Sequence, residues 1–265
     1  MNAGRIRLVL HRPQSAENLG AAARVMKNFD LQRLVVVAPE AWAGPPRGGG
    51  PGTAREDVLA RARRMARKAA DLLDQLEVHP DLRAALGTAT WTCGTTSRAV
   101  EGRPQLDPRQ LAAELARRSE AGEVAVVFGE ERRGLSDAEL ELCQAVCTIP
   151  TGQAYDSMNL AQAVAVVAYE LAMTARGVPA PAAAPLAAAP SGAPPAEPAR
   201  HATVEALWTR AQAVLARAGY LNPQNPEHIL ADFRRLLSRA DPTQREVELL
   251  LAALRALERQ LGQAG

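Results

Sequence analysis

The sequence predicts an α/β protein: a parallel β-sheet with helices on both faces, followed by a small all-α C-terminal domain. Two observations support this fold class. Over the first part of the 265-residue chain, short β-branched runs alternate with amphipathic stretches, as in sheets built from strand–helix units. A segment with seven prolines, residues 178–199, then separates this part from three stretches of helical period.

The elements of the first part follow one another in a regular order. The predicted strands are Arg5–Leu10, Arg33–Val37, Thr88–Cys93, Val124–Phe128 and Ala145–Ile149. The predicted helices are Glu17–Phe29, Arg55–Leu76, Pro108–Arg118, Ser136–Leu142 and Ser157–Arg176. Three helix starts have recognisable caps: Asp107 before Pro108, Ser136 in a capping box with Glu139, and Ser157. Loops at the carboxyl ends of parallel strands are where ligand sites are expected.

Three parts of the chain are therefore expected: an α/β domain over residues 1–177, a linker over 178–199 and a helical domain over 200–265. Prolines so frequent forbid a helix, so the linker is expected to be an extended tether. Helices are predicted over Ala202–Ala218, Glu227–Arg239 and Thr243–Leu261, since glycine and prolines interrupt the pattern between them.

Composition excludes several classes of protein. The three cysteines, Cys93, Cys143 and Cys147, form no CxxC and the histidines have no metal-ligand spacing, so buried reduced thiols and no metal are expected. The longest apolar run, Leu160–Ala175, is too short to span a bilayer, and Met1–Leu10 lacks a cleavage site. These patterns are typical of a cytoplasmic protein without a membrane segment.

Clusters of basic residues suggest a nucleic-acid partner, although the net charge is only +2. Five basic residues lie between Arg61 and Lys68, and smaller groups are Arg132/Arg133 and Arg234/Arg235/Arg239. Such groups can neutralise phosphates, but a solvated helix face explains them equally well. Aromatic residues make up 3% of the chain, so base stacking cannot contribute much.

Motifs of several enzyme classes are missing: the sequence has no GxSxG, GxxxxGK[ST] or HExxH, and no GxGxxG after its first strand. The glycine-rich segment Ala43–Thr53 is not a phosphate-binding loop of either type. Polar or glycine-containing segments at strand ends remain, and these are the candidates for function: Asn18–Arg24, Gly94–Arg98, Phe128–Ser136 and Pro150–Leu160.

Together these segments resemble the three motifs of the SPOUT superfamily, in its TrmH/SpoU branch. NLGAAAR resembles the first motif, FGEERRGLS the second and IPTG…YDSMNLAQAV the third, in the same order and over Ile6–Arg176. Within the branch, GTTSR at Gly94–Arg98 and the C-terminal stretch from Gly219 onward are most similar to the TrmJ family of tRNA 2′-O-methyltransferases. Asp156 departs from the pattern, since that family commonly has Ser there.

The resemblance implies an activity: methyl transfer from S-adenosylmethionine to a ribose 2′-hydroxyl, at nucleotide 32 (cytidine, uridine or both) of the tRNA anticodon loop. It also implies a trefoil-knotted sheet and a homodimer, neither of which composition could show. The alternatives left open are an rRNA 2′-O-methyltransferase and an RNA-binding protein of this fold without catalysis. The helical C-terminal domain favours tRNA.

The resemblance also assigns residues to roles. The catalytic group comprises Arg24, Asn18, Glu131, Ser157 and Asn159. The cofactor pocket comprises Thr95, Thr96, Ser97, Gly129, Ile149, Asp156, Ser157 and Met158. The RNA-binding residues are Arg24 and Arg98, and in the C-terminal domain Arg234, Arg235 and Arg239. Because a guanidinium has a pKa above about 12, Arg24 is expected to stabilise the developing alkoxide rather than to take its proton.

Overall fold

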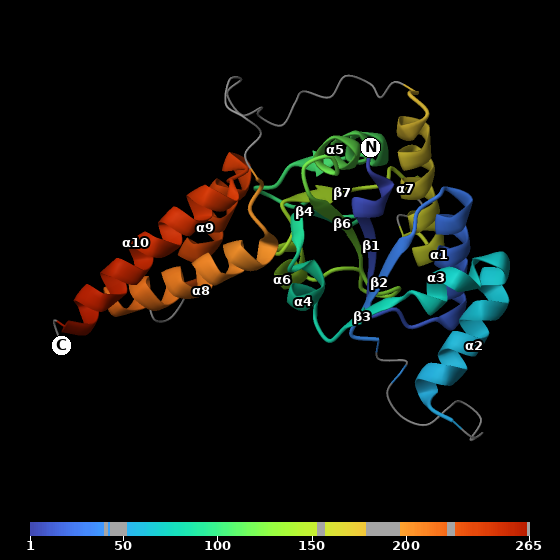
Figure 1. Cartoon of the computed structure of the whole chain (residues 1–265), viewed down its shortest axis with the longest axis horizontal. Helices are drawn as coiled ribbons and strands as arrows, with labels where there is room; N and C mark the ends of the chain where they lie inside the picture. Colours follow the sequence, from blue (N-terminus) through green and yellow to red (C-terminus); the bar gives the residue numbers. More distant parts are fainter. Residues whose placement is uncertain (40–41, 43–51, 153–156, 179–196, 222–225, 264–265) are drawn as a thin grey trace. The chain divides into compact units, whose positions relative to one another are not determined.

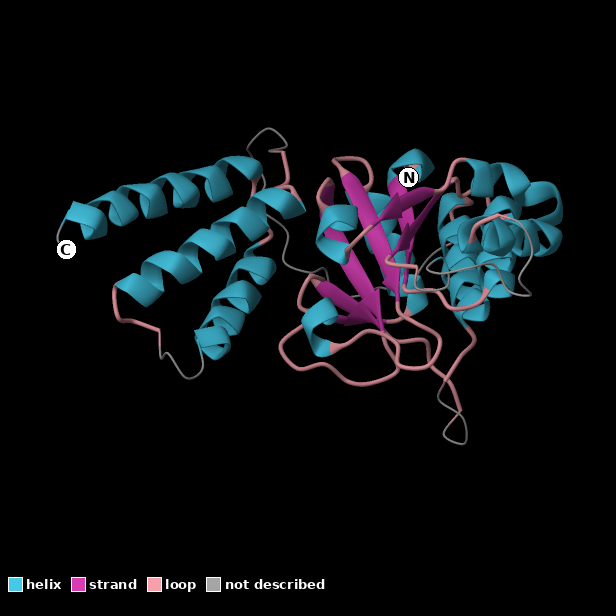
Figure 2. Cartoon of the chain, turned by 90° about the horizontal axis from the view of Figure 1, so that it is seen from below, coloured by secondary structure: helices cyan, strands magenta, loops and turns pink. Residues whose placement is uncertain are grey.

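The structure is a computed structural model that describes residues 1–39, 42, 52–152, 157–178, 197–221 and 226–263 (Figure 1). The chain divides into two compact units, Met1–Ala85 with Trp91–Ala184, and Leu86–Thr90 with Pro185–Gly265. Figure 2 shows the strands gathered into one sheet, whereas the described residues after 197 fold into helices. The expected α/β class with a helical C-terminal part is confirmed.

The order of elements along the chain is as follows. The strands are β1 (Ile6–His11), β2 (Arg33–Val37), β3 (Glu77–His79), β4 (Ala89–Thr95), β5 (Gln105–Leu106), β6 (Glu123–Phe128) and β7 (Ala145–Cys147). The helices are η1 (Ala3–Arg5), α1 (Ala16–Asn28), α2 (Ala54–Ala66), η3 (Arg67–Ala69), α3 (Ala70–Asp74), α4 (Leu82–Leu86), α5 (Pro108–Arg118), α6 (Asp137–Leu140), α7 (Leu160–Ala175), α8 (His201–Arg217), α9 (Pro226–Ala240) and α10 (Gln244–Gln263).

The seven strands form one parallel sheet in the order β3-β2-β1-β6-β4-β7-β5. The two central strands β1 and β6 are almost wholly buried, with Leu10 paired to Phe128 at their carboxyl ends. Helix α7 packs against both α1 and α5, and these helices lie on one side of the sheet, with α4 and α6 on the other (Figure 1). Because the strands are parallel, the carboxyl ends of β6, β4 and β7 share one edge of the sheet.

Close packing of α1 on α2 depends on a glycine. A Cβ added to Gly20 would lie 2.1 Å from the carbonyl oxygen of Ala62 and 2.8 Å from the Cβ of Met65. No side chain fits there, so the backbones of the two helices are in direct contact at Gly20. The small residues of the NLGAAAR segment are thus explained, at Gly20, by helix packing.

Some of the expected elements are corrected by the structure. The single helix predicted over Arg55–Leu76 is broken into α2, η3 and α3, because Arg67 has a positive φ of 55° that no α-helix accommodates. Strands β3 and β5 and helix α4 were not predicted, since elements of two to five residues leave too short a pattern to detect. The expected caps Asp107 and Ser136 are confirmed, each in a capping box.

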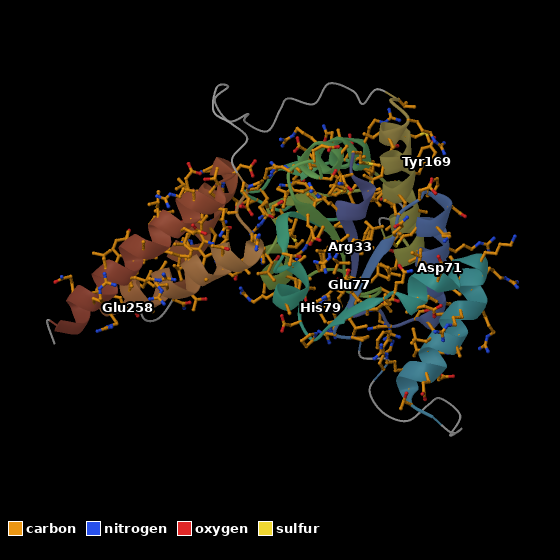
Figure 3. The ribbon with its side chains drawn as sticks, in the orientation of Figure 1. Arg33, Asp71, Glu77, His79, Tyr169 and Glu258 are labelled. Atoms are coloured by element: carbon orange, nitrogen blue, oxygen red, sulfur yellow. The ribbon has the colours of Figure 1, made fainter. Side chains whose placement is uncertain are left out.

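Charged residues inside the sheet are paired with each other. Arg33 on β2 and Glu77 on β3 point toward one another (Figure 3), with 2.9 Å between guanidinium and carboxylate. Arg7, which is 2% exposed, donates to the other oxygen of Glu77 at 2.8 Å. Partial burial acts to raise the pKa of Glu77, but the two arginines outweigh it and hold the pKa below its usual value. This network stabilises the sheet away from the strand ends that carry the motifs.

The helices after residue 197 have a core of their own. Leu207, Val247 and Leu251 are buried together with Ala199, and Val204, Leu237 and Leu254 pack around them. The three predicted helices are confirmed as α8, α9 and α10. The boundaries of the linker stay a prediction, because residues 179–196 lie outside the described part, and the trefoil knot stays a prediction too.

Candidate active site

A pocket of about 240 Å³ lies at the carboxyl ends of β4, β6 and β7. Three loops line it, which follow these strands and correspond to segments singled out in the sequence. The described lining residues are Thr95, Thr96, Ser97, Arg98, Phe128, Gly129, Glu130, Glu131, Arg132, Arg133, Gly134, Leu135, Cys147, Ile149, Thr151, Ser157, Met158, Leu160 and Ala163. The structure thus brings the three loops together on one pocket, as their positions after parallel strands predict.

All but one of the residues expected to bind the cofactor lie in this lining. Thr95 ends β4, Thr96 and Ser97 come from the loop after it, and Gly129 comes from the loop after β6. Ile149, Ser157 and Met158 come from the segment between β7 and α7. Asp156 lies outside the described residues.

The loop after β6 folds back on itself at two glycines. Gly134 donates its amide to the carbonyl of Glu130 at 2.9 Å and has a φ of 67°, a conformation that favours glycine. A Cβ on Gly129 would lie 2.1 Å from the carbonyl carbon of Gly134. The turn therefore requires glycine at residue 129, because the backbone of Gly134 occupies the place of a side chain, and both glycines line the pocket.

Glu131 holds the start of α1. Its carboxylate accepts hydrogen bonds from the amides of Gln14 (2.9 Å) and Ser15 (3.0 Å), and from the side-chain amide of Asn18 (3.1 Å). Ser15 is in turn the N-cap of α1. The resemblance implied that Glu131 orders the second loop; the structure shows its carboxylate fixing the first loop and so connecting the two.

Asn18 continues this chain of hydrogen bonds to the third loop. Its side-chain oxygen accepts from the side-chain amide of Asn159 at 3.0 Å. The oxygen of Asn159 accepts from the backbone amides of Ala161 (2.9 Å) and Gln162 (3.4 Å) at the start of α7. Glu131, Asn18 and Asn159 thus form a relay, named here the motif relay, which joins all three motifs.

The N-cap of α7 is therefore Asn159 and not Ser157, which corrects the sequence-based prediction. The helix begins at Leu160 rather than at Ser157, because the carboxamide of Asn159 satisfies the free amides of the first turn. Ser157 is left outside the helix, where it lines the pocket. A capping motif and a ligand-binding motif overlap here, so the sequence alone could not separate them.

The two arginines expected to meet RNA have different surroundings. Arg24 is exposed on α1, beyond the described lining of the pocket, and no acidic side chain of the described residues forms an ion pair with it. Arg98 lines the pocket and forms an ion pair with Asp137 at 2.7 Å, while donating to the carbonyl of Leu135 at 3.3 Å. Arg98, in the loop after β4, therefore stabilises the segment that follows β6.

The arginines of the C-terminal helices do not form one free cluster. Arg234 pairs with Glu205 of α8 at 2.7 Å and stacks over Trp208, 5.5 Å from the ring centroid. Arg235 pairs with Asp232, whereas Arg239 is exposed. Arg234 thus connects α8 to α9, a role that the spacing of arginines in the sequence did not reveal.

Apolar residues complete the pocket, and sequence reasoning missed most of them. Leu135, Leu160 and Cys147 lie in the wall, flanking the motifs. Burial raises the pKa of the Cys147 thiol to about 12, so it is protonated at neutral pH and contributes only an apolar surface. All three cysteines are free and buried, as expected.

The lining suits a ligand that carries a base and a ribose. Leu135, Ile149 and Leu160 offer apolar walls for a base, and the hydroxyls of Thr96, Ser97 and Ser157 can meet a ribose. Among the described residues no group of His, Cys, Asp and Glu could hold a metal ion. No described helix has the length and apolar character needed to cross a membrane.

Comparison with known proteins agrees with this geometry. Residues 5–169 match the SpoU rRNA Methylase family, and residues 202–265 match the tRNA methyltransferase TrmJ, C-terminal domain. The tRNA (cytidine/uridine/adenosine-2′-O-)-methyltransferase TrmJ of Pseudomonas aeruginosa is 34% identical, over 94% of this chain and 92% of its own length. The corresponding cytidine/uridine enzyme of Klebsiella pneumoniae is 30% identical, over 96% of this chain and 97% of its own length.

Solved structures give the same result. The crystal structure of TrmJ from Z. mobilis is 30% identical and superposes with a TM-score of 0.74, covering 95% of this chain and 98% of that one. A probable methyltransferase from Bordetella pertussis is 36% identical with a TM-score of 0.55, covering 64% of this chain and 95% of that one.

Proposed function

Because the chain belongs to the SpoU methylase family, and within it to the TrmJ group, we propose that it is an S-adenosylmethionine-dependent tRNA 2′-O-methyltransferase. The observation that carries this proposal is the pocket. The second and third motifs line it, and hydrogen bonds of Asn18 connect the first motif to both. The match of residues 202–265 to the TrmJ C-terminal domain favours tRNA over rRNA. The finer target, nucleotide 32 of the anticodon loop, rests on the likeness to TrmJ, and a cytoplasmic site of action follows from that substrate.

When bound, S-adenosylmethionine supplies an electrophilic methyl group on a sulfonium. The residues that would hold it are Thr95, Thr96, Ser97, Gly129, Ile149, Ser157 and Met158. The chain's part in the reaction is to position the ribose and exclude water, since orientation supplies much of the rate acceleration. Arg24 stabilises negative charge on the 2′-oxygen, and the proton leaves to water or to an RNA phosphate.

The proposal is tested by methylation of transcripts. Purified protein with labelled S-adenosylmethionine is expected to methylate a tRNA transcript at one ribose, mapped by mass spectrometry of nuclease digests. A transcript with a 2′-deoxynucleotide at position 32 is expected to accept no methyl group. Methylation of an rRNA fragment with the tRNA left unmodified would contradict the proposal, and binding of tRNA without transfer would favour the inactive RNA-binding alternative.

A homodimer forms part of the proposal, and the exposed Tyr169 on α7 supports it. On α7, Val164, Val167 and Leu171 face inward, while Tyr169 lies on the outer side. Tyr169, labelled in Figure 3, is 47% exposed and meets Phe29, the C-cap of α1, edge-on with ring centroids 6.1 Å apart. An exposed aromatic side chain of this kind can be buried in an interface between subunits.

Light scattering at micromolar concentration is expected to give a mass of about twice 28.2 kDa. Replacing Tyr169 with Glu is expected to shift the protein toward monomer, because a charge would then have to be buried in the interface. Val78→Glu, which places the same charge at a 37% exposed apolar position on β3, serves as the matched control. A fully active wild-type monomer would contradict this part of the proposal.

The C-terminal helices are proposed to supply tRNA affinity rather than chemistry. Residues 200–265 contain nine arginines, no lysine and seven acidic residues. Because Arg234 forms an ion pair with Glu205, Arg239 and the other exposed arginines are the candidates for phosphate contact. A chain ending at Arg176 is expected to keep its affinity for S-adenosylmethionine, as measured by calorimetry, and to bind tRNA about tenfold or more weakly with a flatter salt dependence. Equal tRNA affinity and salt slope in both proteins would contradict this assignment.

A further inference from the structure

A row of basic side chains on the α/β unit belongs neither to the pocket nor to the C-terminal helices. Arg64 near the end of α2, and Arg67 and Lys68 in η3, are all exposed. Arg24, on the neighbouring helix α1, is exposed as well. These four residues are named here the α2 basic face, and the packing of the two helices shows that they belong together.

Helix α1 runs alongside α2 and its continuation, at a nearly constant register. Arg61 lies 3.7 Å from Glu17, and further along Lys27 lies 2.5 Å from Asp71; both pairs join residues 44 positions apart. Between them, Gly20 meets Ala62 and Met65 at backbone distance. Arg24 therefore lies between these two ion pairs along α1, and Arg64, Arg67 and Lys68 lie between them along α2 and η3.

Pairing distinguishes the α2 basic face from an ordinary solvated surface. The other cations nearby are neutralised: Arg61 by Asp57 and Glu17, Arg63 by Asp74, and Lys27 by Asp71. Within the described residues, none of the four members of the face has an acidic partner within 4 Å. Four uncompensated positive charges therefore remain along two segments that pack side by side, which attracts a polyanion.

The backbone at Arg67 adds a second, independent feature. Its φ of 55° and ψ of −117° lie in a region that L-residues rarely adopt and that glycine would enter without strain. An arginine is nevertheless found at this bend, where the chain turns from α2 into η3. Strained backbone of this kind is concentrated at functional positions.

We propose that the α2 basic face binds the phosphodiester backbone of the RNA substrate, next to the ribose that Arg24 engages. This inference rests on the proposed function, and it adds a contact within the α/β unit itself. The face lies along the helix that carries Arg24, so phosphates held by Arg64, Arg67 and Lys68 would flank the methylated nucleotide. Its contacts are to phosphates and would not depend on base sequence.

The test uses the full-length protein and two matched double variants. Arg64→Gln with Lys68→Gln removes two charges from the face. Arg109→Gln with Arg117→Gln removes two charges from α5, where the arginines are 46% and 58% exposed and paired with Glu170 and Glu114. Glutamine keeps a long polar side chain and a good helix propensity, so both variants are expected to fold, and thermal melts check this.

Binding of tRNA transcripts is measured between about 50 and 200 mM KCl. The α2 variant is expected to bind about tenfold more weakly than wild type at the upper end, equally for several tRNAs, and its slope of log Kd against log salt falls by about 1.5 to 2. KM for tRNA rises while affinity for S-adenosylmethionine stays unchanged. The α5 variant is expected to match the wild type. An α2 variant with the affinity and slope of the α5 variant overturns the proposal.

Failure of this inference can be distinguished from failure of the proposed function. If wild-type protein methylates tRNA and the α2 variant binds it normally, only the α2 basic face is wrong. If wild-type protein transfers no methyl group to tRNA but the α2 variant still loses affinity and salt slope relative to the α5 variant, the face stands and the proposed function falls.

Discussion

Replacing Arg24 with alanine is expected to lower the turnover of tRNA methylation by at least about a hundredfold, with folding and the affinity for S-adenosylmethionine unchanged. Arg24 is exposed on α1 and forms no ion pair with an acidic side chain of the described residues, so the fold loses little without it. Its charge is proposed to act on the alkoxide that develops on the ribose, and removing one such donor typically costs roughly 10²–10³ in rate. Single-turnover rates with saturating tRNA separate this effect from weaker binding.

Two controls sharpen this prediction. Lys27→Ala removes a charge from the same helix, one turn further along, where the lysine is paired with Asp71; its turnover is expected to remain near that of the wild type. Arg24→Lys keeps the charge but loses the planar guanidinium, and is expected to recover only part of the rate. An Arg24→Ala variant with turnover near that of the wild type would show that another group stabilises the transition state.

Much of the fold could be predicted from the sequence because its signals are local. The runs that became β1, β2, β4, β6 and β7 are apolar and β-branched, and Asp107 and Ser136 cap their helices as their spacing indicates. The break at Arg67 could not be predicted. The segment has helical period on both sides of it, and the positive φ at Arg67 that separates α2 from η3 leaves no mark in that pattern.

The candidate site was predicted at the level of segments, whereas the connections between its side chains were not. The pocket-lining residues Thr96, Gly129 and Ile149 come from three loops that follow different strands, and only the sheet order brings them together. The roles of individual side chains stay predictions, and for Arg234 the pairing with Glu205 of α8 makes a structural role the simpler interpretation. Such pairings depend on tertiary contacts that no spacing in the sequence encodes.

Substitutions in the motif relay are expected to lower turnover almost as much as substitution of Arg24, although no atom of the relay need contact the ribose. Glu131→Ala removes the acceptor for the amides of Gln14 and Ser15 and for the side chain of Asn18, leaving part-buried donors unsatisfied. Each such loss costs about 1–3 kcal/mol, which frees the start of α1 and with it the placement of Arg24. Turnover is expected to fall about a hundredfold, with a smaller loss in Glu131→Gln, which keeps one acceptor oxygen.

A double-mutant cycle on Asn18 and Asn159 tests whether the relay acts as one unit. Their side chains are joined by a 3.0 Å hydrogen bond between the first and third motifs, while Asn159 separately caps α7. If the hydrogen bond matters for positioning, Asn18→Ala and Asn159→Ala each lower turnover, and the double variant is little worse than either, giving a coupling of about 1 kcal/mol or more. Asn159→Asp keeps the cap but cannot donate to Asn18, so it is expected to retain thermal stability and still lose turnover. Fully additive effects, or normal turnover in Asn159→Asp, would mean that the three motifs act independently and that Asn159 serves only as a helix cap.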